Sequence, residues 1–212
     1  MKKNRKKPAY FHPVLDVKTI AAFDFDGTIT RKDTMTDFIR FVKGDTAYFF
    51  GLVTLSPILL GYLFRLIGNQ NAKERLLAYF FKDTPESEMY EWGEKYYTQR
   101  LQTLIRPKAA EAIEWHKAQG NRLFLITASL TFWTQSWAEA NGFTLIASEP
   151  EIKEGLFTGK IKGQNCYKQQ KVNRLLALLN DSETYRCYAY GDTSGDTELL
   201  RWADIPHYRV FE

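Results

Sequence analysis

The fold of this 212-residue chain is decided by residues 19–27, which read TIAAFDFDG. The apolar run is typical of a short strand buried on both faces, and the Asp-Gly pair at its end is a turn signal. A second apolar segment, residues 187–190, is followed in the same way by GDTSGD at residues 191–196. We therefore expect two strands that both end in paired acidic residues.

Between these two strands, apolar segments alternate with helical patterns. Alternation of this kind indicates an α/β fold with a doubly wound parallel sheet, Rossmann-like in its order of elements. The expected elements are strands at 122–127 and 145–147, a small hairpin at 152–161, and helices at 107–120, 171–179 and 197–202.

The pattern from residue 33 to about residue 105 is helical almost throughout, which is too long for one crossover between neighbouring strands. We interpret it as a helical cap inserted into the core. The predicted division is a basic N-terminal arm at 1–17, a core made of 18–32 and 107–212, and a cap at 33–106.

The acidic residues fall at the ends of the predicted strands. Asp24 and Asp26 follow the first strand, and Asp192 and Asp196 follow the strand at 187–190. Ligands bind at the carboxyl ends of strands in open parallel sheets, so these four carboxylates are expected at one crevice. Their mutual repulsion favours a hard divalent cation with oxygen ligands, above all Mg²⁺. The alternative is that these acids only form turns and helix caps.

The composition is that of a globular protein, with 44% hydrophobic and 25% charged residues and two cysteines outside any Cys-x-x-Cys pair. The cysteine usage and the lack of a signal-peptide pattern favour the cytoplasm. The net charge is +4, but five of the 29 basic residues lie within residues 1–7. The other 24 stand against 25 acidic residues, a net charge of −1, which argues against nucleic-acid binding. The basic arm is either a solvated tail or a contact for an anionic membrane surface.

Four segments together resemble the haloacid dehalogenase-like hydrolases. They are FDFDGTIT at 23–30, ITAS at 126–129, Lys171, and GDTSGD at 191–196, in the order that the family uses. The helical insertion after the first segment resembles the subgroup that includes phosphoserine phosphatase. The stretch from Thr127 to Lys171 is similar to bacterial relatives of the phosphatidylglycerophosphatase C type.

The resemblance implies an Mg²⁺-dependent phosphatase that works through an aspartyl-phosphate. Asp24 would be the nucleophile, and Asp26 would protonate the leaving oxygen and then activate water. The Asp24 side chain, the Asp26 backbone carbonyl and Asp192 would bind Mg²⁺, and Asp196 would orient these ligands.

The same resemblance implies a set of groups that contact the phosphate. Thr127, Ala128 and Lys171 would hold the phosphoryl oxygens, and Gly27 would let the backbone turn tightly enough to present its amides. Asp33 stands where the phosphoserine enzymes have a substrate-contacting acid, although it is equally suited to be a helix N-cap.

The chain departs from the closest resembling proteins at Lys168. A glycine usually stands three residues before the lysine of the third motif, and Lys168 occupies that place here. The additional cation makes Lys168 a rival to Lys171 for the phosphate.

Residues 46–64 form a run without a charged side chain, which raises the question of a membrane span. A single span would place Asp24 and Asp192 on opposite sides of the membrane, so the site could not assemble. Ser56 followed by Pro57 is a helix start signal with serine as the cap, which predicts two helices of about 11 residues. Each would be about 17 Å long, too short for an apolar core of about 30 Å. The run then packs in the cap, forms a dimer contact, or lies at a membrane interface.

These observations favour a phosphomonoesterase and leave its substrate and oligomeric state open. One version takes a small metabolite such as phosphoserine or histidinol phosphate. The other takes a lipid phosphate, such as phosphatidylglycerophosphate or lysophosphatidate, at the inner face of the membrane. A phospho-acceptor signalling domain and a non-catalytic phosphate-binding relative are the alternatives from other classes, and Asp26 argues against the first because receivers need no acid there.

Overall fold

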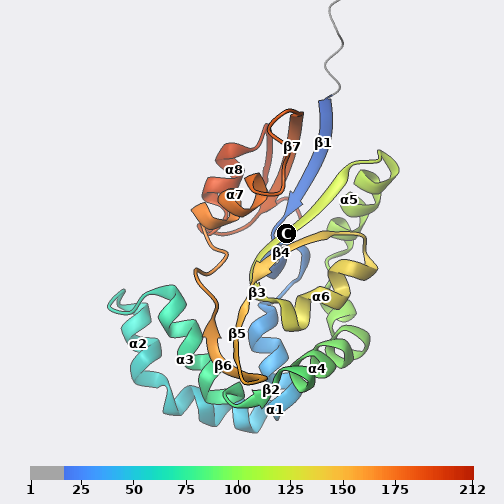
Figure 1. Cartoon of the computed structure of the whole chain (residues 1–212). Helices are drawn as coiled ribbons and strands as arrows, with labels where there is room; N and C mark the ends of the chain where they lie inside the picture. The colour runs from blue at the N-terminus through green and yellow to red at the C-terminus, as the bar shows by residue number, and fades with distance from the viewer. Residues whose placement is uncertain (1–16) are drawn as a thin grey trace, which may run out of the picture.

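The computed structural model describes residues 17–212, so the predicted basic arm lies outside the described residues except for its last position. Figure 1 shows a sheet flanked by helices in one half of the molecule and a group of helices with a small sheet in the other half. Strand β1 (Val17–Phe23) begins at the end of the molecule away from these cap helices and runs toward them.

The central sheet has five strands in the order β4-β3-β1-β7-β8, and every neighbouring pair is parallel. The other four strands are β3 (Arg122–Leu130), β4 (Thr144–Ser148), β7 (Thr184–Gly191) and β8 (Ile205–Tyr208). The predicted α/β fold with a doubly wound parallel sheet is therefore confirmed. Strand β8 was not predicted, because four partly exposed residues that include Pro206 carry too little periodicity.

Alternate residues of β1 pack into two different cores, one on each face of the sheet. Ala21 and Phe23 join the larger core, and Ile20 and Ala22 join the smaller one. The larger core is covered by α5 (Pro107–Ala118) and α6 (Thr131–Ala140), and the smaller by α7 (Gln169–Leu176) and α8 (Thr197–Trp202). Burial on both faces explains why this strand is a continuous apolar run.

The chain leaves β1 through a tight turn, η1 (Phe25–Ile29). Gly27 adopts a positive φ of 84° in this turn, a conformation that L side chains rarely take. A Cβ atom at Gly27 would also lie 2.3 Å from Asp192 Oδ2. Glycine is therefore required here for its backbone conformation and for the close approach of the loop after β7.

The cap is made of helices and one small antiparallel sheet. Its helices and its first strand are α1 (Thr34–Thr54), α2 (Ser56–Leu63), α3 (Asn69–Phe81), β2 (Thr84–Pro85), α4 (Glu86–Gln99) and η2 (Leu101–Leu104). The predicted hairpin is present as β5 (Pro150–Lys153) and β6 (Leu156–Ile161), and it pairs with β2 in the order β2-β6-β5. The predicted division counts this hairpin with the core; in the structure β6 lies against α3, and the ring of Phe157 also contacts Phe132 of α6.

The hairpin approaches helix α3 very closely. A Cβ atom at Gly159 would lie 2.4 Å from Ala78 Cα, so the absence of a side chain is what allows β6 to meet the helix. Gly159 also has a positive φ of 83°. A segment that follows β4 in the chain thus supports the helix that carries one side of the cap.

The apolar run 46–64 is divided between two helices, as predicted, but the boundaries differ. Helix α1 starts at Thr34 and is broken at Gly44, where φ is 82°, and it ends at Thr54. Ser56 is not the N-cap of α2, because Leu55 takes that position and no side chain caps the helix. Among residues 17–212 no single helix is long and apolar enough to cross a membrane, and α1 with α2 meets that criterion only as a pair bent by 66°.

Candidate active site

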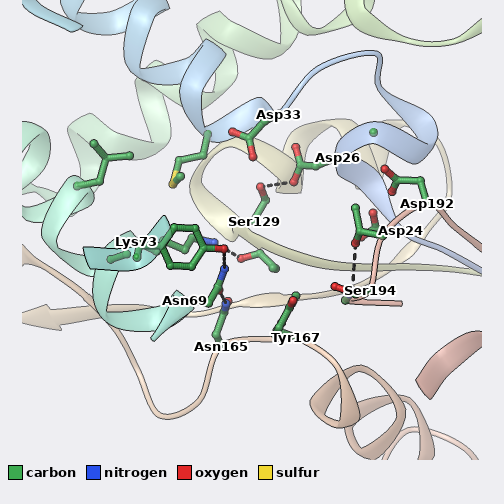
Figure 2. Close-up of a pocket in the computed structure, with 18 of the residues that line it drawn as sticks. Asp24, Asp26, Asp33, Asn69, Lys73, Ser129, Asn165, Tyr167, Asp192 and Ser194 are labelled. Atoms are coloured by element: carbon green, nitrogen blue, oxygen red, sulfur yellow. Dashed lines mark hydrogen bonds between the residues drawn. The ribbon is translucent and has the colours of Figure 1, made fainter. Parts of the chain in front are cut away.

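A cavity of about 630 Å³ lies where the carboxyl ends of β1 and β7 face the cap. Asp24 and Asp192 line it from the ends of these two strands, and Asp26 lines it from the turn η1. The cap contributes Leu59 from α2 and Lys73 from α3. Figure 2 shows the three aspartates on one side of the cavity and Lys73 on the other. Charged groups from two ends of the chain are thus brought to one place.

Lys171 is the cation at the centre of the acidic group. It is buried on α7, and its Nζ donates hydrogen bonds to Asp24 Oδ1 and, at 2.6 Å, to Asp196 Oδ1. Burial lowers the pKa of Lys171, but the attraction of the two carboxylates outweighs it and raises the pKa above its ordinary value. The ammonium group therefore remains charged in a place where it faces the cavity.

Burial has the opposite consequence for Asp24. Desolvation raises the pKa of Asp24 well above its ordinary value, Lys171 lowers it, and the neighbouring carboxylates of Asp196 and Asp26 raise it further. A single ammonium group does not offset the burial of this cluster. Additional positive charge at the site would favour the ionised carboxylate.

Asp196 is fully engaged in holding the site together. Its Oδ2 accepts hydrogen bonds from the backbone N–H groups of Asp192 and Thr193, at 3.2 and 3.0 Å, and from Thr193 Oγ1 at 3.1 Å. Burial raises its pKa, but Lys171 and these donors outweigh burial, so that the pKa of Asp196 is lowered. Asp196 thereby fixes both Lys171 and the start of the loop that carries Asp192.

The donor set fits a hard divalent cation. Carboxylate oxygens of Asp24, Asp192 and Asp196 lie within 4.8 Å of one another. Both oxygens of Asp196 are already occupied, so Asp24 and Asp192 are the side chains suited to bind an ion. Thr28 Oγ1 donates to Asp192 Oδ1 at 2.9 Å and orients it. The predicted ligand from Asp26 is its backbone carbonyl, and this part of the ligand set stays a prediction.

Asp26 is held on both of its carboxylate oxygens. The backbone N–H of Thr34 donates to Oδ1 at 2.6 Å, and Ser129 Oγ donates to Oδ2 at 2.7 Å. Figure 2 shows the bond from Ser129. Asp26 lies on the cavity surface two residues after Asp24. It is therefore placed to exchange a proton with a group bound beside Asp24.

The two residues predicted from the ITAS segment differ in their access to the cavity. Ala128 lines the cavity, whereas Thr127 is fully buried and is not among the lining residues. The Thr127 hydroxyl accepts the backbone N–H of Ser129 at 3.0 Å and lies 3.5 Å from Asp26 Oδ2. In this conformation Thr127 supports the loop around the cavity, and its contact with a phosphate stays a prediction.

The other open points of the sequence analysis concern Asp33 and Lys168. Asp33 caps helix α1 by accepting the backbone N–H of Thr36 at 2.8 Å, and it also lines the cavity, so both proposed roles remain compatible with its position. Lys168 is exposed, has a positive φ of 52°, and extends over the ring of Tyr167. The structure therefore directs Lys171, and not Lys168, at Asp24.

Among the polar residues of the cavity that the sequence analysis gave no role, Lys73 and Ser129 contact the predicted site residues. Lys73 projects from α3, and its Nζ donates to the backbone carbonyl of Ala128. Burial lowers the pKa of Lys73. Ser129 lies within the quoted ITAS segment but received no role. The sequence carries no signal for Lys73, since a lysine on a helix is ordinarily solvated. Ser129 could have been proposed, because its hydroxyl lies within the ITAS segment.

One wall of the cavity is apolar. It is formed by Met35 from α1, Leu59 and Tyr62 from α2, and Ala72 and Leu76 from α3. All of these residues belong to the predicted cap, whereas Asp24, Asp26, Asp192 and Lys171 belong to the predicted core. A ligand that binds with its charged end at Asp24 would therefore place its remaining part against apolar side chains.

Comparison with protein families gives a match over most of the chain. A family model described as haloacid dehalogenase-like hydrolase matches residues 21–201. The matched region begins within β1 and ends within α8, so it includes the core and the cap.

Individual proteins also match over most of this chain. Protein CicA of Caulobacter vibrioides is 30% identical over 194 residues, which cover 91% of this chain and 86% of CicA. Phosphoserine phosphatase SerB1 of Mycobacterium tuberculosis is 26% identical over 198 residues, which cover 89% of this chain and 63% of SerB1. A crystal structure of a protein of unknown function from Bordetella pertussis superimposes with a TM-score of 0.77 and 24% identity, over 90% of this chain and 89% of that one. At 24% identity, this structural similarity is evidence for the fold alone.

Proposed function

The chain belongs to the haloacid dehalogenase-like hydrolases and is a phosphatase similar to phosphoserine phosphatase, and we propose that it hydrolyses phosphate monoesters with Mg²⁺ through an aspartyl-phosphate on Asp24. The observation that carries the proposal is the pairing of Asp24 with Lys171 at the cavity, with Asp26 two residues away. Asp24 as nucleophile, Lys171 as cation and Asp26 as proton donor would then surround the phosphoryl group of a bound ester.

In the first step, an Asp24 carboxylate oxygen attacks phosphorus and the bond from phosphorus to the ester oxygen breaks. Asp26 gives a proton to the departing oxygen, so that an alcohol leaves. The Lys171 ammonium faces the phosphoryl oxygens and stabilises the charge that grows on them. In the second step, Asp26 takes a proton from water, which attacks phosphorus, releases inorganic phosphate and restores Asp24.

The oxygen ligands of Asp24 and Asp192 would hold Mg²⁺ beside Lys171. When bound, this ion would supply positive charge that offsets the negative charge of the phosphoryl oxygens and would help to orient the phosphoryl group toward Asp24. Asp196 holds the other groups of the site in position, because it accepts hydrogen bonds from Lys171 and from the backbone N–H of Asp192.

The test is phosphate release by the full chain with Mg²⁺ and with excess chelator. The panel contains phosphoserine and histidinol phosphate in solution, and phosphatidylglycerophosphate and lysophosphatidate in mixed micelles. Mg²⁺-dependent release from any of them supports the proposal. Absence of release from all of them would contradict it and favour a phosphate-binding or phospho-acceptor role.

A second version of this function, hydrolysis of an amphiphilic or lipid phosphate at a membrane surface, is supported by the cap. Besides the apolar cavity wall, seven apolar residues of α1, α2 and the following loop are more than half exposed. They are Phe49, Phe50, Val53, Leu60, Leu63, Phe64 and Leu66, here called the α1–α2 apolar residues. Helix α2 thus contributes to the cavity through Leu59 and to the surface through Leu63.

Charge favours lipid over a second protein copy as the occupant of this surface. Between Thr46 and Ala72 the only charged side chain is Arg65, which is exposed and basic. A second copy packed on α2 would cover the side of the cavity that Leu59 and Tyr62 form.

The membrane version is tested by sedimentation with vesicles of neutral and of anionic phospholipids. We expect wild type to bind, and Leu63→Ser with Phe64→Ser to reduce binding about tenfold, because two exposed apolar side chains are lost. Leu178→Ser is the matched control, since Leu178 is 47% exposed in the core half. Equal binding by all three proteins, or binding by none, would contradict the membrane version and leave a small soluble ester and a cytoplasmic location as the proposal.

A further inference from the structure

We propose that Ser129 is a positioning residue that holds the Asp26 carboxylate at the end of a directed hydrogen-bond chain, which begins at the indole of Trp133. The proposal rests on the proposed role of Asp26 as proton donor to the leaving group. Ser129 is neither among the predicted phosphate-binding residues of the ITAS segment nor among the predicted magnesium ligands.

The chain has three links, all between side chains. Trp133 Nε1 donates to Thr34 Oγ1 at 3.0 Å, Thr34 Oγ1 lies 3.1 Å from Ser129 Oγ, and Ser129 Oγ donates to Asp26 Oδ2 at 2.7 Å. Thr34 is fully buried, and Trp133 and Ser129 are 1% and 2% exposed. Water therefore does not compete for the first two links, and the third lies at the surface of the cavity, where Asp26 is half-buried.

The two ends of the chain fix its direction. An indole N–H can only donate, and Asp26 can only accept while it is ionised, the state in which it takes a proton from water. Ser129 has one proton, which it donates to Asp26, so the bond between Thr34 and Ser129 is donated by the Thr34 hydroxyl, which itself accepts from Trp133. Ser129 accepts that bond and gives its single proton to Asp26. Each hydroxyl thus donates once and accepts once, and no other arrangement satisfies both ends.

This direction restricts the orientation of the Asp26 carboxylate. Ser129, from the core strand β3, holds Oδ2, and the backbone N–H of Thr34, at the start of the cap helix α1, holds Oδ1. Rotation of the carboxylate would break bonds on both sides. The same residue, Thr34, acts on Oδ1 through its amide and on Oδ2 through its hydroxyl and Ser129. The junction between core and cap thereby sets the position of the proton donor.

The experiment compares two substrates that differ in their need for a proton donor. 4-Nitrophenyl phosphate releases a stable phenolate and needs little protonation, whereas an alkyl phosphate must leave as an alcohol. The full chain is assayed with Mg²⁺ on 4-nitrophenyl phosphate and on the alkyl ester of the panel that it hydrolyses fastest. The variants are Ser129→Ala, Thr34→Val and, as the matched control that keeps a hydroxyl, Thr34→Ser.

We expect Ser129→Ala to lower kcat/KM for the alkyl ester about 100-fold and kcat/KM for 4-nitrophenyl phosphate less than about threefold, because misplacement of a catalytic group costs about that much and kcat/KM reports only the steps up to departure of the leaving group. Thr34→Val should show the same selectivity to a smaller extent, and Thr34→Ser should resemble wild type. Equal losses on both substrates, or no loss, would overturn the proposal, since a merely structural defect does not distinguish leaving groups. If Ser129→Ala fails to fold, the Thr34 pair gives the same comparison.

Asp26→Asn separates this proposal from the function on which it rests. A selective loss on the alkyl ester in Asp26→Asn but not in Ser129→Ala would overturn only the positioning role. An Asp26→Asn variant without any selectivity would contradict the proton-donor role of Asp26, and the proposal for Ser129 would fail with it.

Discussion

The two walls of the cavity are built in opposite ways. On the core wall, Asp24 and Lys171 are 6% and 2% exposed, and Lys171 joins Asp24 to Asp196. On the cap wall, helix α2 contains no fully buried residue: Leu59 lines the cavity, Leu63 is exposed, and only Ile58 and Leu59 pack against the hydrophobic core. The core wall loses its arrangement when one group is removed, whereas the cap wall can change without loss of the fold. We therefore expect substitutions on the core wall to change the rate of the reaction and substitutions on the cap wall to change the choice of substrate.

Asp24→Asn should give the largest effect on the core wall. It keeps the shape of the side chain but removes the nucleophilic carboxylate, so we expect phosphate release to fall about 10⁴-fold or more. The fold should persist, because Asp196 still accepts from Lys171. Steady-state turnover and thermal unfolding measure the two quantities, and a variant that keeps more than about a tenth of the wild-type rate would contradict the assignment of the nucleophile.

Lys171→Met should destabilise the core wall as well as inactivate it. Removing one partner of a buried ion pair leaves the other charge unpaired, which costs about 3–5 kcal/mol of unfolding free energy. The matched control is Lys117→Met, because Lys117 forms an exposed pair with Glu114 and should change stability by less than about 1 kcal/mol. Denaturant unfolding measures both. Equal losses of unfolding free energy in the two variants would contradict the expectation that the buried ion pair of Lys171 matters more for stability than the exposed pair of Lys117.

His116 offers a pH-dependent test of the core interior behind the site. It is fully buried, and its Nε2 lies 2.9 Å from the hydroxyl of Tyr190, the residue before Gly191. Burial, and the charge of His207 to a lesser extent, lower the pKa of His116 to about 4.

Below pH 6.5 His116 therefore binds a proton in the unfolded chain but stays neutral in the folded chain. The unfolding free energy should fall as the pH drops from about 6.5 to about 4. The loss should reach about 3 kcal/mol near pH 4, since the folded-state pKa is about 4 instead of 6.5 and each pKa unit is worth about 1.4 kcal/mol. His116→Gln should remove this part of the pH dependence. Parallel pH profiles of wild type and variant would show that His116 contributes nothing in this range.

The smallest effect is expected on the outer surface of the cap. Leu63→Ser and Phe64→Ser should each change the unfolding free energy by less than about 0.5 kcal/mol, because these side chains are 71% and 70% exposed. Leu77→Ala on α3 is the matched buried change, and it should cost about 2–5 kcal/mol. A large loss of stability in the surface variants would mean that α2 packs more firmly than its exposure indicates.

The sequence predicted the parts of the site that follow directly from strand ends. Asp24, Asp26, Asp192 and Asp196 each lie within six residues of an apolar run, and parallel strands bring such positions to one edge of a sheet. Lys171 needed the resemblance to a family, because a lysine on a helix carries no signal of its own. Its burial between Asp24 and Asp196 depends on where α7 packs, and periodicity does not specify this.

The remaining features depend on contacts between distant segments. The hairpin β5–β6 was predicted as an element, but its packing on α3 requires the close approach of Gly159 to Ala78. Lys73 enters the cavity because α3 is held there by this hairpin and by the bend between α1 and α2. Strand β8 exists because β7 offers an edge to which four residues can pair.

The sequence by itself therefore determined the class of fold, the order of its elements and the acids that meet at the carboxyl edge, because local periodicity and strand ends are encoded by neighbouring residues. Only the tertiary structure decided that Thr127 is buried, that Lys73 faces the acids, and that Trp133, Thr34 and Ser129 form a directed chain to Asp26. Hydrogen bonds between side chains about a hundred residues apart depend on distances of a few tenths of an ångström, and the packing of the whole chain sets those distances.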